Sequence, residues 1–295
     1  MRRAEYGMEN NMISLENGDI SVLINKKGAE LKSLKRNGKE YLWQGIPEIW
    51  GGTAPLLFPI CGGLKDDKFI FDGKEYTLQK HGYIRFCEFE VEKKESTSAT
   101  FLHRSDKDTY AVYPFNYELR VTYTLTDDGV CVTYRVDNTD TNQMYFSIGS
   151  HEGYVTPEGI EDYDIIFPEK ETLNSVILDG NLLEKHSVPI IKDSNVLPLY
   201  DKHFTLDALV FKDLKSRSAT LRNRKTGRFV KVDFPDKPYF LLWHKHAAPY
   251  ICLEPWCGIP DTQDSNYDLT KKEGIISLPS GKTYEISHFI TVGEE

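Results

Sequence analysis

The chain has 295 residues, of which 40% are hydrophobic and 27% are charged, a composition typical of a folded globular protein and not of a disordered one. Its 36 basic and 45 acidic side chains give a formal net charge of −9, which argues against a nucleic-acid or anionic-membrane partner, because such binders normally carry a basic face. No stretch approaches the roughly 18 apolar residues that a membrane span needs.

The first residues contain two arginines but no apolar segment, so we do not interpret them as a signal peptide. The cysteines are odd in number and form no CxxC pair. Together these features predict reduced thiols in a cytoplasmic protein, and not disulfides or metal ligands. The five cysteines are Cys61, Cys87, Cys131, Cys252 and Cys257.

One segment predicts a β-hairpin with a single buried face. Residues Tyr117–Leu125 alternate between apolar and polar side chains, and the turn-forming sequence Asp127-Asp128-Gly129 follows. The chain then alternates again over Val130–Val136. Because successive side chains of a strand point to opposite faces, the pattern predicts two antiparallel strands that share an apolar face.

Shorter strand patterns recur along the whole chain, and no long segment carries the 3.6-residue apolar period of a helix. Many strands joined by tight turns predict an all-β fold of antiparallel sheets, in a sandwich or a barrel. Since no linker interrupts them, we predict a single domain over residues 12–295, preceded by a polar extension over residues 1–11. The further predicted strands are Ile20–Ile24, Tyr41–Trp43, Phe69–Phe71, Tyr76–Leu78, Cys87–Glu92, Ala99–His103, Met144–Ile148, Tyr163–Phe167, Ala208–Phe211, Ala219–Leu221, Phe229–Phe234, Tyr239–Trp243, Tyr250–Leu253 and Tyr284–Val292.

Two histidines stand where strands are predicted to end. His81 precedes a glycine, which allows a sharp backbone turn, so its imidazole is either aimed into a cleft or part of a surface loop. His151 follows an apolar strand and the sequence Ser-Ile-Gly-Ser, a place where a rigid scaffold can present a reactive group. The alternative for His151 is a partly buried structural histidine.

Two carboxylates border apolar runs. Glu254 follows Tyr250–Leu253 and precedes a proline and Trp256. Glutamate is rarely buried without a partner, so Glu254 is either a candidate general base or a side chain turned outward at a rim. The indole of Trp256 could line a sugar site, because the C–H faces of sugars pack on aromatic rings. Asp207 could accept hydrogen bonds from hydroxyl groups, or serve as a turn or cap residue.

Sequence motifs for cofactors and metals are missing. The chain contains no GxGxxG, Walker, GxSxG or HExxH pattern. His244 and His246 form an HxH pair without a third ligand, which is weak evidence for zinc. A nucleophilic pair of Cys61 with His81 has no support beyond the presence of both residues. We therefore predict neither a cofactor nor a metal.

Taken together, these segments resemble the aldose 1-epimerase (galactose mutarotase) family, and within it the bacterial LacX-like branch, which is similar to hexose-6-phosphate mutarotases. The resemblance extends from about Met12 to Val292, and the ordered set of motifs is more specific than any one of them. The segments that carry it are Ala54–Ile60, His81–Arg85, Ser147–His151, Asp207–Phe211 and Cys252–Asp261.

The resemblance implies an antiparallel β-supersandwich with an open sugar-binding cleft, acting as a monomer or homodimer on a hexose or hexose phosphate. His151 matches the general acid of the family and Glu254 its general base. His81 matches a second histidine, which hydrogen-bonds the sugar near its ring oxygen. Asp207 matches an aspartate that holds ring hydroxyls, and Arg85 matches a basic residue that lies near the phosphate in the phosphate-using relatives.

Two positions depart from the family pattern. Gly63 stands where many relatives carry an arginine, and Glu152 follows His151 where many have a proline. The first difference removes a cation from the expected cleft and motivates an alternative, a carbohydrate-binding protein on the same fold that has lost catalysis. A glycoside hydrolase that uses Glu254 and Asp207 is a further alternative, although it leaves the histidines unexplained.

The matched residue types suit mutarotation. The reaction opens a cyclic hemiacetal by removing a proton from the C1 hydroxyl and delivering one to the ring oxygen, and a carboxylate with an imidazolium can do both. Since the ordinary pKa of histidine is about 6.5, we expect a neighbouring carboxylate, Glu254 or Glu152, to favour the charged form of His151. The coupled pair should then give a bell-shaped pH dependence.

Overall fold

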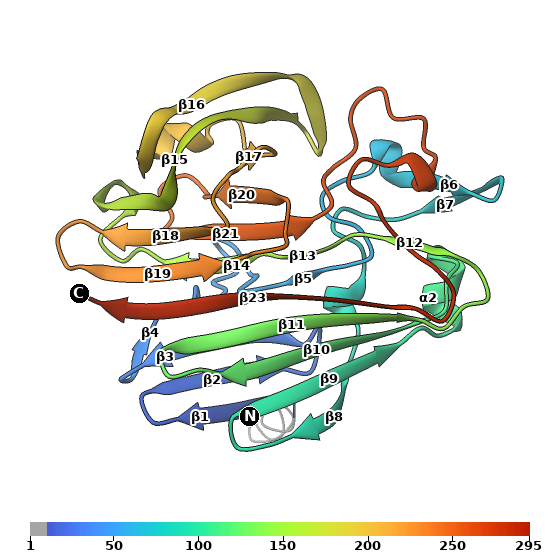
Figure 1. The fold of residues 1–295 in the computed structure, drawn as a ribbon, viewed down its shortest axis with the longest axis horizontal. Helices are drawn as coiled ribbons and strands as arrows, with labels where there is room; N and C mark the ends of the chain where they lie inside the picture. The colour runs from blue at the N-terminus through green and yellow to red at the C-terminus, as the bar shows by residue number, and fades with distance from the viewer. Residues whose placement is uncertain (1–10) are drawn as a thin grey trace.

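The computed structural model describes residues 11–295, so the predicted extension lies outside the described residues except for its last position, Asn11. Within that range the chain is built mainly of antiparallel strands (Figure 1), and its one α-helix, α2 (Lys107–Val112), has six residues. No helix of residues 11–295 is long and apolar enough to cross a membrane. The predicted all-β antiparallel fold class is confirmed.

The strands of residues 11–295 form one large sheet and three small ones. The large sheet has fifteen strands. Its order is β5 (Leu56–Leu57), β13 (Ile148–Ser150), β21 (Tyr250–Cys257), β20 (Tyr239–Trp243), β17 (Leu209–Phe211), β15 (Tyr163–Asp179), β18 (Ser218–Asn223), β19 (Arg228–Asp233), β23 (Thr283–Glu294), β11 (Gly129–Asn138), β10 (Tyr117–Leu125), β9 (Ser98–Arg104) and β8 (Glu90–Lys94), with β14 (Glu152–Val155) paired to β21 and β16 (Leu182–Pro198) paired to β15.

The small sheets and single turns of 3-10 helix complete the described chain. The first sheet has the order β1 (Met12–Asn17), β2 (Ile20–Asn25), β3 (Glu30–Arg36) and β4 (Lys39–Glu40), and the other two pair β6 (Lys68–Phe71) with β7 (Lys74–Thr77) and β12 (Met144–Phe146) with β22 (Ile276–Leu278). The 3-10 turns are η1 (Lys65–Asp67), η2 (Ile84–Phe86), η3 (Ile160–Asp162), η4 (Asp201–Phe204) and η5 (Leu269–Lys271).

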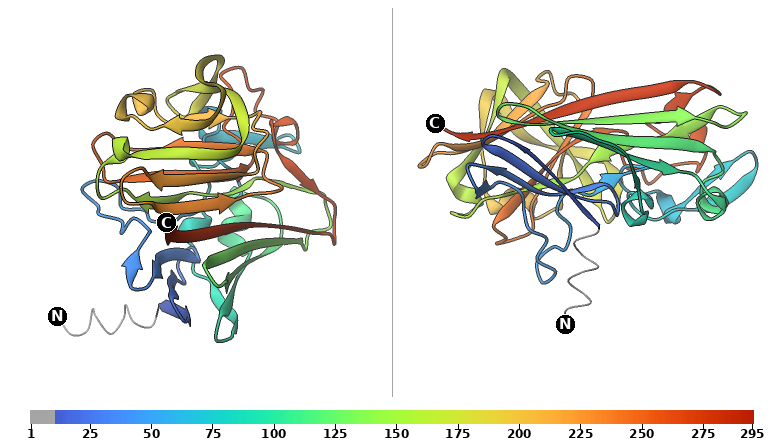
Figure 2. Two further views of the ribbon diagram at one scale, coloured as in Figure 1. Left: turned by 60° about the vertical axis from the view of Figure 1, so that its left-hand side comes forward. Right: turned by 90° about the horizontal axis from the view of Figure 1, so that it is seen from below.

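The large sheet curls so that strands distant in its order face each other across the core (Figure 2). Glu152 on β14 and His288 on β23 are an example, since Oε1 of the first lies 3.0 Å from Nε2 of the second. The sheet β1–β4 packs near β10, where the Tyr123 hydroxyl donates to the Ala29 carbonyl at 2.8 Å. Apolar side chains of the large sheet and of the sheet β1–β4 pack together and form one large hydrophobic core.

The hairpin predicted over Tyr117–Leu125 and Val130–Val136 is confirmed. Strands β10 and β11 pair in antiparallel register from Tyr117 opposite Asn138 to Leu125 opposite Val130. Along β10 the apolar positions are buried and the intervening polar ones are partly or fully exposed, so the side-chain alternation identified the buried face correctly.

Three predicted strands differ from the structure. Met144–Ile148 divides at Ser147, whose N–H donates to the Pro59 carbonyl at 2.7 Å, and its halves join different sheets as β12 and β13. The prediction of a strand over Tyr41–Trp43 is wrong, because only Leu42 forms an isolated bridge. The strand expected from Cys87 begins at Glu90, because η2 occupies the residues just before Cys87.

The sequence predicted only the first five residues of the long hairpin β15–β16. Each arm has 17 residues, and many positions are exposed, so the arms lack the apolar alternation that identifies a strand. The tip folds against the loop after β21, where the Leu183 N–H donates to the Asp261 carbonyl at 2.8 Å. This contact brings the tip to the cavity described next.

Candidate active site

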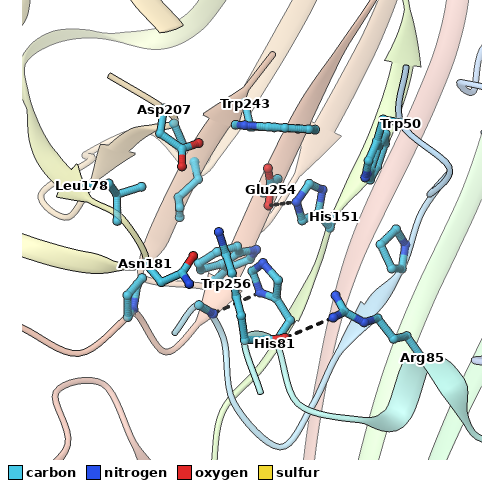
Figure 3. Close-up of a pocket in the computed structure, with 16 residues that line it drawn as sticks. Trp50, His81, Arg85, His151, Leu178, Asn181, Asp207, Trp243, Glu254 and Trp256 are labelled. Atoms are coloured by element: carbon cyan, nitrogen blue, oxygen red, sulfur yellow. Dashed lines mark hydrogen bonds and ion pairs between the residues drawn. The ribbon is translucent and has the colours of Figure 1, made fainter. Parts of the chain in front are cut away.

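A cavity of about 350 Å³ opens over β20 and β21 (Figure 3). The six site residues predicted from the sequence all line it, although they come from four separate segments of the chain. The lining residues are Trp50, Pro55, Gly62, Lys80, His81, Arg85, His151, Leu178, Asn181, Asp207, Ala208, Leu241, Trp243, Glu254, Trp256 and Pro260.

The register of β21 places His151 beside Glu254. Gly149 pairs with Trp256 and Glu152 pairs with Leu253, so the same antiparallel register extended between them sets His151 opposite Glu254. Directly opposite residues of an antiparallel pair project to the same face. The expectation that Glu254 ends its strand is wrong, since β21 continues to Cys257 and carries Glu254 in its interior.

Glycines on either side of His151 make room for two indoles. A Cβ on Gly149 would lie 2.6 Å from an atom of the Trp256 ring, and a Cβ on Gly153 would lie 2.8 Å from an atom of the Trp50 ring. Both distances are shorter than van der Waals contact allows, so a larger residue at either position would displace an indole. The glycines therefore let aromatic walls pack directly beside His151.

His151 and Glu254 form a buried acid–base pair. Nε2 of His151 lies 3.4 Å from Oε2 of Glu254, and the two side chains are 13% and 1% exposed. Neither Oε2 of Glu254 nor Nδ1 of His151 makes a hydrogen bond within the described chain. Buried polar atoms normally have hydrogen-bond partners, so these two atoms keep an unused capacity to bond a ligand in the cavity.

Burial sets the protonation of this pair. It lowers the pKa of His151 to about 3, with Lys80 acting in the same direction, and raises the pKa of Glu254 well above its ordinary 4.5. Glu152 does favour the charged form of His151, as expected from the sequence, but burial outweighs it and the net expectation was wrong. Burial therefore favours the uncharged forms of both side chains.

His81 is held as a neutral hydrogen-bond donor. Its backbone φ is 67°, and the following Gly82 also has a positive φ of 68°. The Gly62 N–H donates to Nδ1 of His81 at 3.1 Å, so the ring hydrogen must lie on Nε2. Burial and the nearby His151 hold the pKa of His81 well below its ordinary value.

Charged side chains also line the cavity: Arg85 and Asp207 lie on opposite sides of it (Figure 3), and Lys80 is a further lining residue. A guanidinium N–H of Arg85 donates to the Lys80 carbonyl at 3.2 Å, and within residues 11–295 neither side chain forms an ion pair. Burial lowers the pKa of Arg85, which still leaves a guanidinium charged at neutral pH. Asp207 reaches the cavity from the loop before β17, with a φ of 78°.

Aromatic rings enclose His151. The ring centres of Trp50 and Trp243 lie 5.1 and 5.6 Å from that of His151, and Trp256 stands edge-on to His81 at 5.5 Å. The Trp256 indole N–H donates to the Ser150 carbonyl at 2.9 Å, which fixes its ring. Trp50 and Trp243 were not predicted as site residues, because no local pattern distinguishes them from core aromatics.

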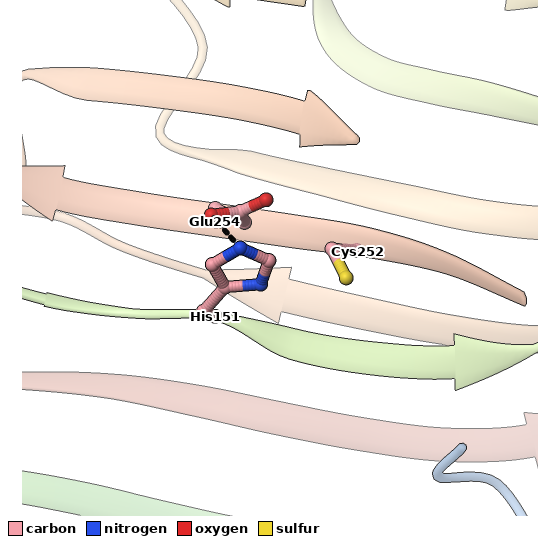
Figure 4. Close-up of side chains that lie close together, drawn as sticks. All are labelled: His151, Cys252 and Glu254. Carbon is pink, nitrogen blue, oxygen red and sulfur yellow. Dashed lines mark ion pairs between the residues drawn. The ribbon is translucent and has the colours of Figure 1, made fainter. Parts of the chain in front are cut away.

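One group of possible metal ligands includes the acid–base pair (Figure 4). The donor atoms of His151, Cys252 and Glu254 lie within 4.8 Å of one another. Burial raises the pKa of the Cys252 thiol well above its ordinary value, so the sulfur packs as a neutral group. Both ring nitrogens of His244 are already occupied, by the Tyr250 carbonyl at 2.7 Å and by Asp201 at 2.8 Å.

Gly63, where the resemblance leads us to expect an arginine, has no room for a side chain. A Cβ there would lie 2.6 Å from the Cβ of Asn181 and 2.8 Å from its carbonyl oxygen. Asn181 belongs to the tip of the β15–β16 hairpin and itself lines the cavity. The neutral side chain of Asn181 therefore lies where the resemblance leads us to expect a cation.

The described chain is thus an antiparallel all-β protein that carries a His–Glu pair between aromatic side chains at a cavity. The family model described as aldose 1-epimerase matches residues 11–288, and the chain belongs to that family.

Relatives match nearly the whole chain. It is 35% identical to the plasmid-encoded protein LacX of Lactococcus lactis subsp. lactis, with 95% of this chain and 99% of the relative covered. Among solved structures, a galactose mutarotase related enzyme from Lactobacillus acidophilus is 34% identical with a TM-score of 0.92, over 96% of this chain and 97% of the other. A galactose mutarotase-like protein from Lactobacillus casei is 29% identical with a TM-score of 0.90, over 96% and 100%.

The crowding at Gly63 predicts a specific loss of stability. Gly63→Ala should lower the free energy of unfolding by about 1–3 kcal/mol, because the new methyl group must displace the hairpin tip. Gly51→Ala is the matched control, since the nearest heavy atom to its added Cβ would lie 3.8 Å away. Urea denaturation of both variants measures the difference, and equal midpoints would contradict the crowding.

Proposed function

We propose that the protein is an aldose 1-epimerase that interconverts the α and β anomers of a hexose or hexose phosphate by general acid–base ring opening. The observation that carries the proposal is the buried pair of Glu254 and His151, 3.4 Å apart and facing a cavity between aromatic rings. A protein that only bound sugar would gain nothing from two buried titratable groups in contact, because their desolvation weakens binding.

The pair can move protons in both directions without exchange with solvent. In the reactive form, His151 is protonated and Glu254 is ionised. In the form favoured by burial, His151 is neutral and Glu254 is protonated. Both forms hold one proton in total. A C1 hydroxyl that donates to the Glu254 carboxylate stabilises this reactive form. Glu254 then takes the C1 proton while His151 protonates the ring oxygen, the aldehyde rotates about C1–C2, and the two roles reverse on closure.

The remaining lining residues fit the task of holding a sugar. The Nε2–H of His81 is free to donate, since Nδ1 already accepts from the Gly62 backbone. The Asp207 carboxylate can accept from ring hydroxyls on the opposite side of the cavity. Trp50 and Trp243 offer apolar surface to the C–H faces of the ring.

The cationic side of the cavity favours a phosphorylated sugar. Lys80 and Arg85 both face the cavity, and within the described chain neither is neutralised by a carboxylate in an ion pair. Arginine binds phosphate through two parallel N–H bonds, and a lysine adds a second positive charge. This supports a hexose phosphate over a neutral hexose.

Anomer exchange measured by NMR on glucose, galactose and their 6-phosphates tests the proposed function. Glu254→Gln and His151→Ala should each lower the exchange rate by about 10²–10⁴-fold, since each removes one proton-transfer group. Glu171→Gln, which neutralises a buried carboxylate on β15, is the control and should keep the rate. Sugar binding by the wild type without exchange would favour a non-catalytic sugar-binding protein, and hydrolysis of a nitrophenyl glycoside would favour a glycosidase.

The pH profile tests the protonation of the pair. The active form holds one proton, so the rate should fall at low pH as His151 gains a second proton and at high pH as Glu254 loses the shared one. We expect the acid limb at about pH 3, because burial lowers the pKa of His151 to that value. We expect the alkaline limb well above the ordinary glutamate pKa of 4.5, because burial raises the pKa of Glu254. The measurement is the buffer-subtracted kcat/KM for a neutral sugar, with circular dichroism to verify folding at each pH. An acid limb near pH 6.5, the ordinary histidine value, would contradict it.

Substitution of Arg85 tests the phosphate side. Arg85→Gln should raise KM for a hexose 6-phosphate by about 10–100-fold, the value of one charge-assisted contact, and change KM for the neutral hexose little. Arg85→Lys keeps the positive charge, so it should raise KM for the hexose 6-phosphate by less than Arg85→Gln does. Equal losses for both sugars in the Gln variant would show that Arg85 does not contact the phosphate.

A further inference from the structure

A second cluster of buried charges lies behind the acid–base pair, in the core and outside the cavity. Glu152, Lys237 and His288 are 4%, 0% and 0% exposed. Oε1 of Glu152 lies 3.0 Å from Nε2 of His288, and Nδ1 of His288 lies 2.9 Å from Nζ of Lys237. The three side chains join β14, β23 and the turn between β19 and β20.

The chain of contacts assigns each proton. A lysine ammonium can only donate, so Nδ1 of His288 accepts from Lys237 and the ring hydrogen lies on Nε2, where it donates to Glu152. Burial raises the pKa of Glu152, but His288 and Lys237 outweigh it and hold that pKa below the ordinary value. The cluster therefore consists of the Lys237 ammonium, the neutral His288 imidazole and the Glu152 carboxylate, joined by two hydrogen bonds.

Glu152, the carboxylate of this cluster, directly follows His151 in the sequence. Glu152 pairs in register with Leu253, the residue before Glu254. Because strand side chains alternate between faces, His151 and Glu254 point into the cavity while Glu152 and Leu253 point into the core. Glu152 thus places a fixed negative charge directly behind the pair, across the thickness of the sheet.

Other charged or titratable groups surround both clusters. The charges that bear on His151 or Glu254 are Lys80, Arg85, Asp207 and Glu152, and His81 and Cys252 lie beside them. Around Glu152 stand His288, Lys237, Tyr123, Tyr134, Tyr154 and Cys252. Glu152 is the carboxylate whose charge acts on both members of the pair. It raises the pKa of His151 and the pKa of Glu254, so it favours a bound proton on each.

We propose that Glu152, anchored by His288 and Lys237, is a positioning residue that fixes the backbone at His151 and supplies the negative charge that keeps a proton on the His151–Glu254 pair. The inference rests on the proposed function. A buried ion pair is often no more stabilising than apolar residues of the same size, so stability alone is a poor explanation for three buried polar groups at this position. An electrostatic role in proton transfer accounts for it.

Glu152→Gln tests the proposal, because it keeps an oxygen that can accept from His288 and removes the charge. The alkaline limb of kcat/KM should move to lower pH by on the order of one unit, as expected for loss of one nearby charge. The titration of a 13C-labelled Glu254 carboxyl, assigned by its loss in Glu254→Gln, should move in the same direction. This second readout needs no turnover, so it separates failure of the proposal from failure of the epimerase function.

Two further variants control for folding and for unspecific effects. Glu171→Gln also neutralises a buried carboxylate that accepts backbone N–H groups, and it should leave both readouts unmoved. If Glu152→Gln does not fold, the double variant Glu152→Gln/Lys237→Met removes the uncompensated lysine charge and should show the same shift. A lower melting temperature with an unmoved alkaline limb and an unmoved Glu254 titration would overturn the proposal and leave a purely structural role.

Discussion

The antiparallel register of β21 against β13 and β14 is the constraint on which the rest of the site depends. It sets His151 opposite Glu254 on the cavity side and Glu152 opposite Leu253 on the core side. A shift by one residue would exchange these faces, burying the acid–base pair in the apolar core and exposing Glu152. The glycines at 149 and 153 support the same register, since each leaves space for one indole beside His151.

Desolvation is the second physical factor that organises the site. The same burial that disfavours charge on His151 and Glu254 strengthens every electrostatic contact made in the cavity. The cavity is also lined by charged groups of both signs, Lys80, Arg85 and Asp207.

The long hairpin β15–β16 shapes one wall of the cavity. Its tip brings Leu178 and Asn181 to the cavity wall and leaves no space for a side chain at Gly63. The tip is itself fastened to the loop after β21 through Leu183. This wall of the cavity is therefore built by a segment whose exposed arms show no strand pattern in the sequence.

The sequence by itself determined the all-β class, the β10–β11 hairpin and the identity of the six candidate residues. Alternation and turn residues are local signals, and motifs such as His-Gly and Glu-Pro-Trp mark polar groups in apolar surroundings. Only the tertiary structure decided that β21 continues past Glu254, that Trp50 and Trp243 enclose His151, and that burial reverses the expected shift in the pKa of His151. All eight residues of β21 are buried, so its sequence lacks the alternation that would specify register and facing, and desolvation depends on neighbours far away in the chain.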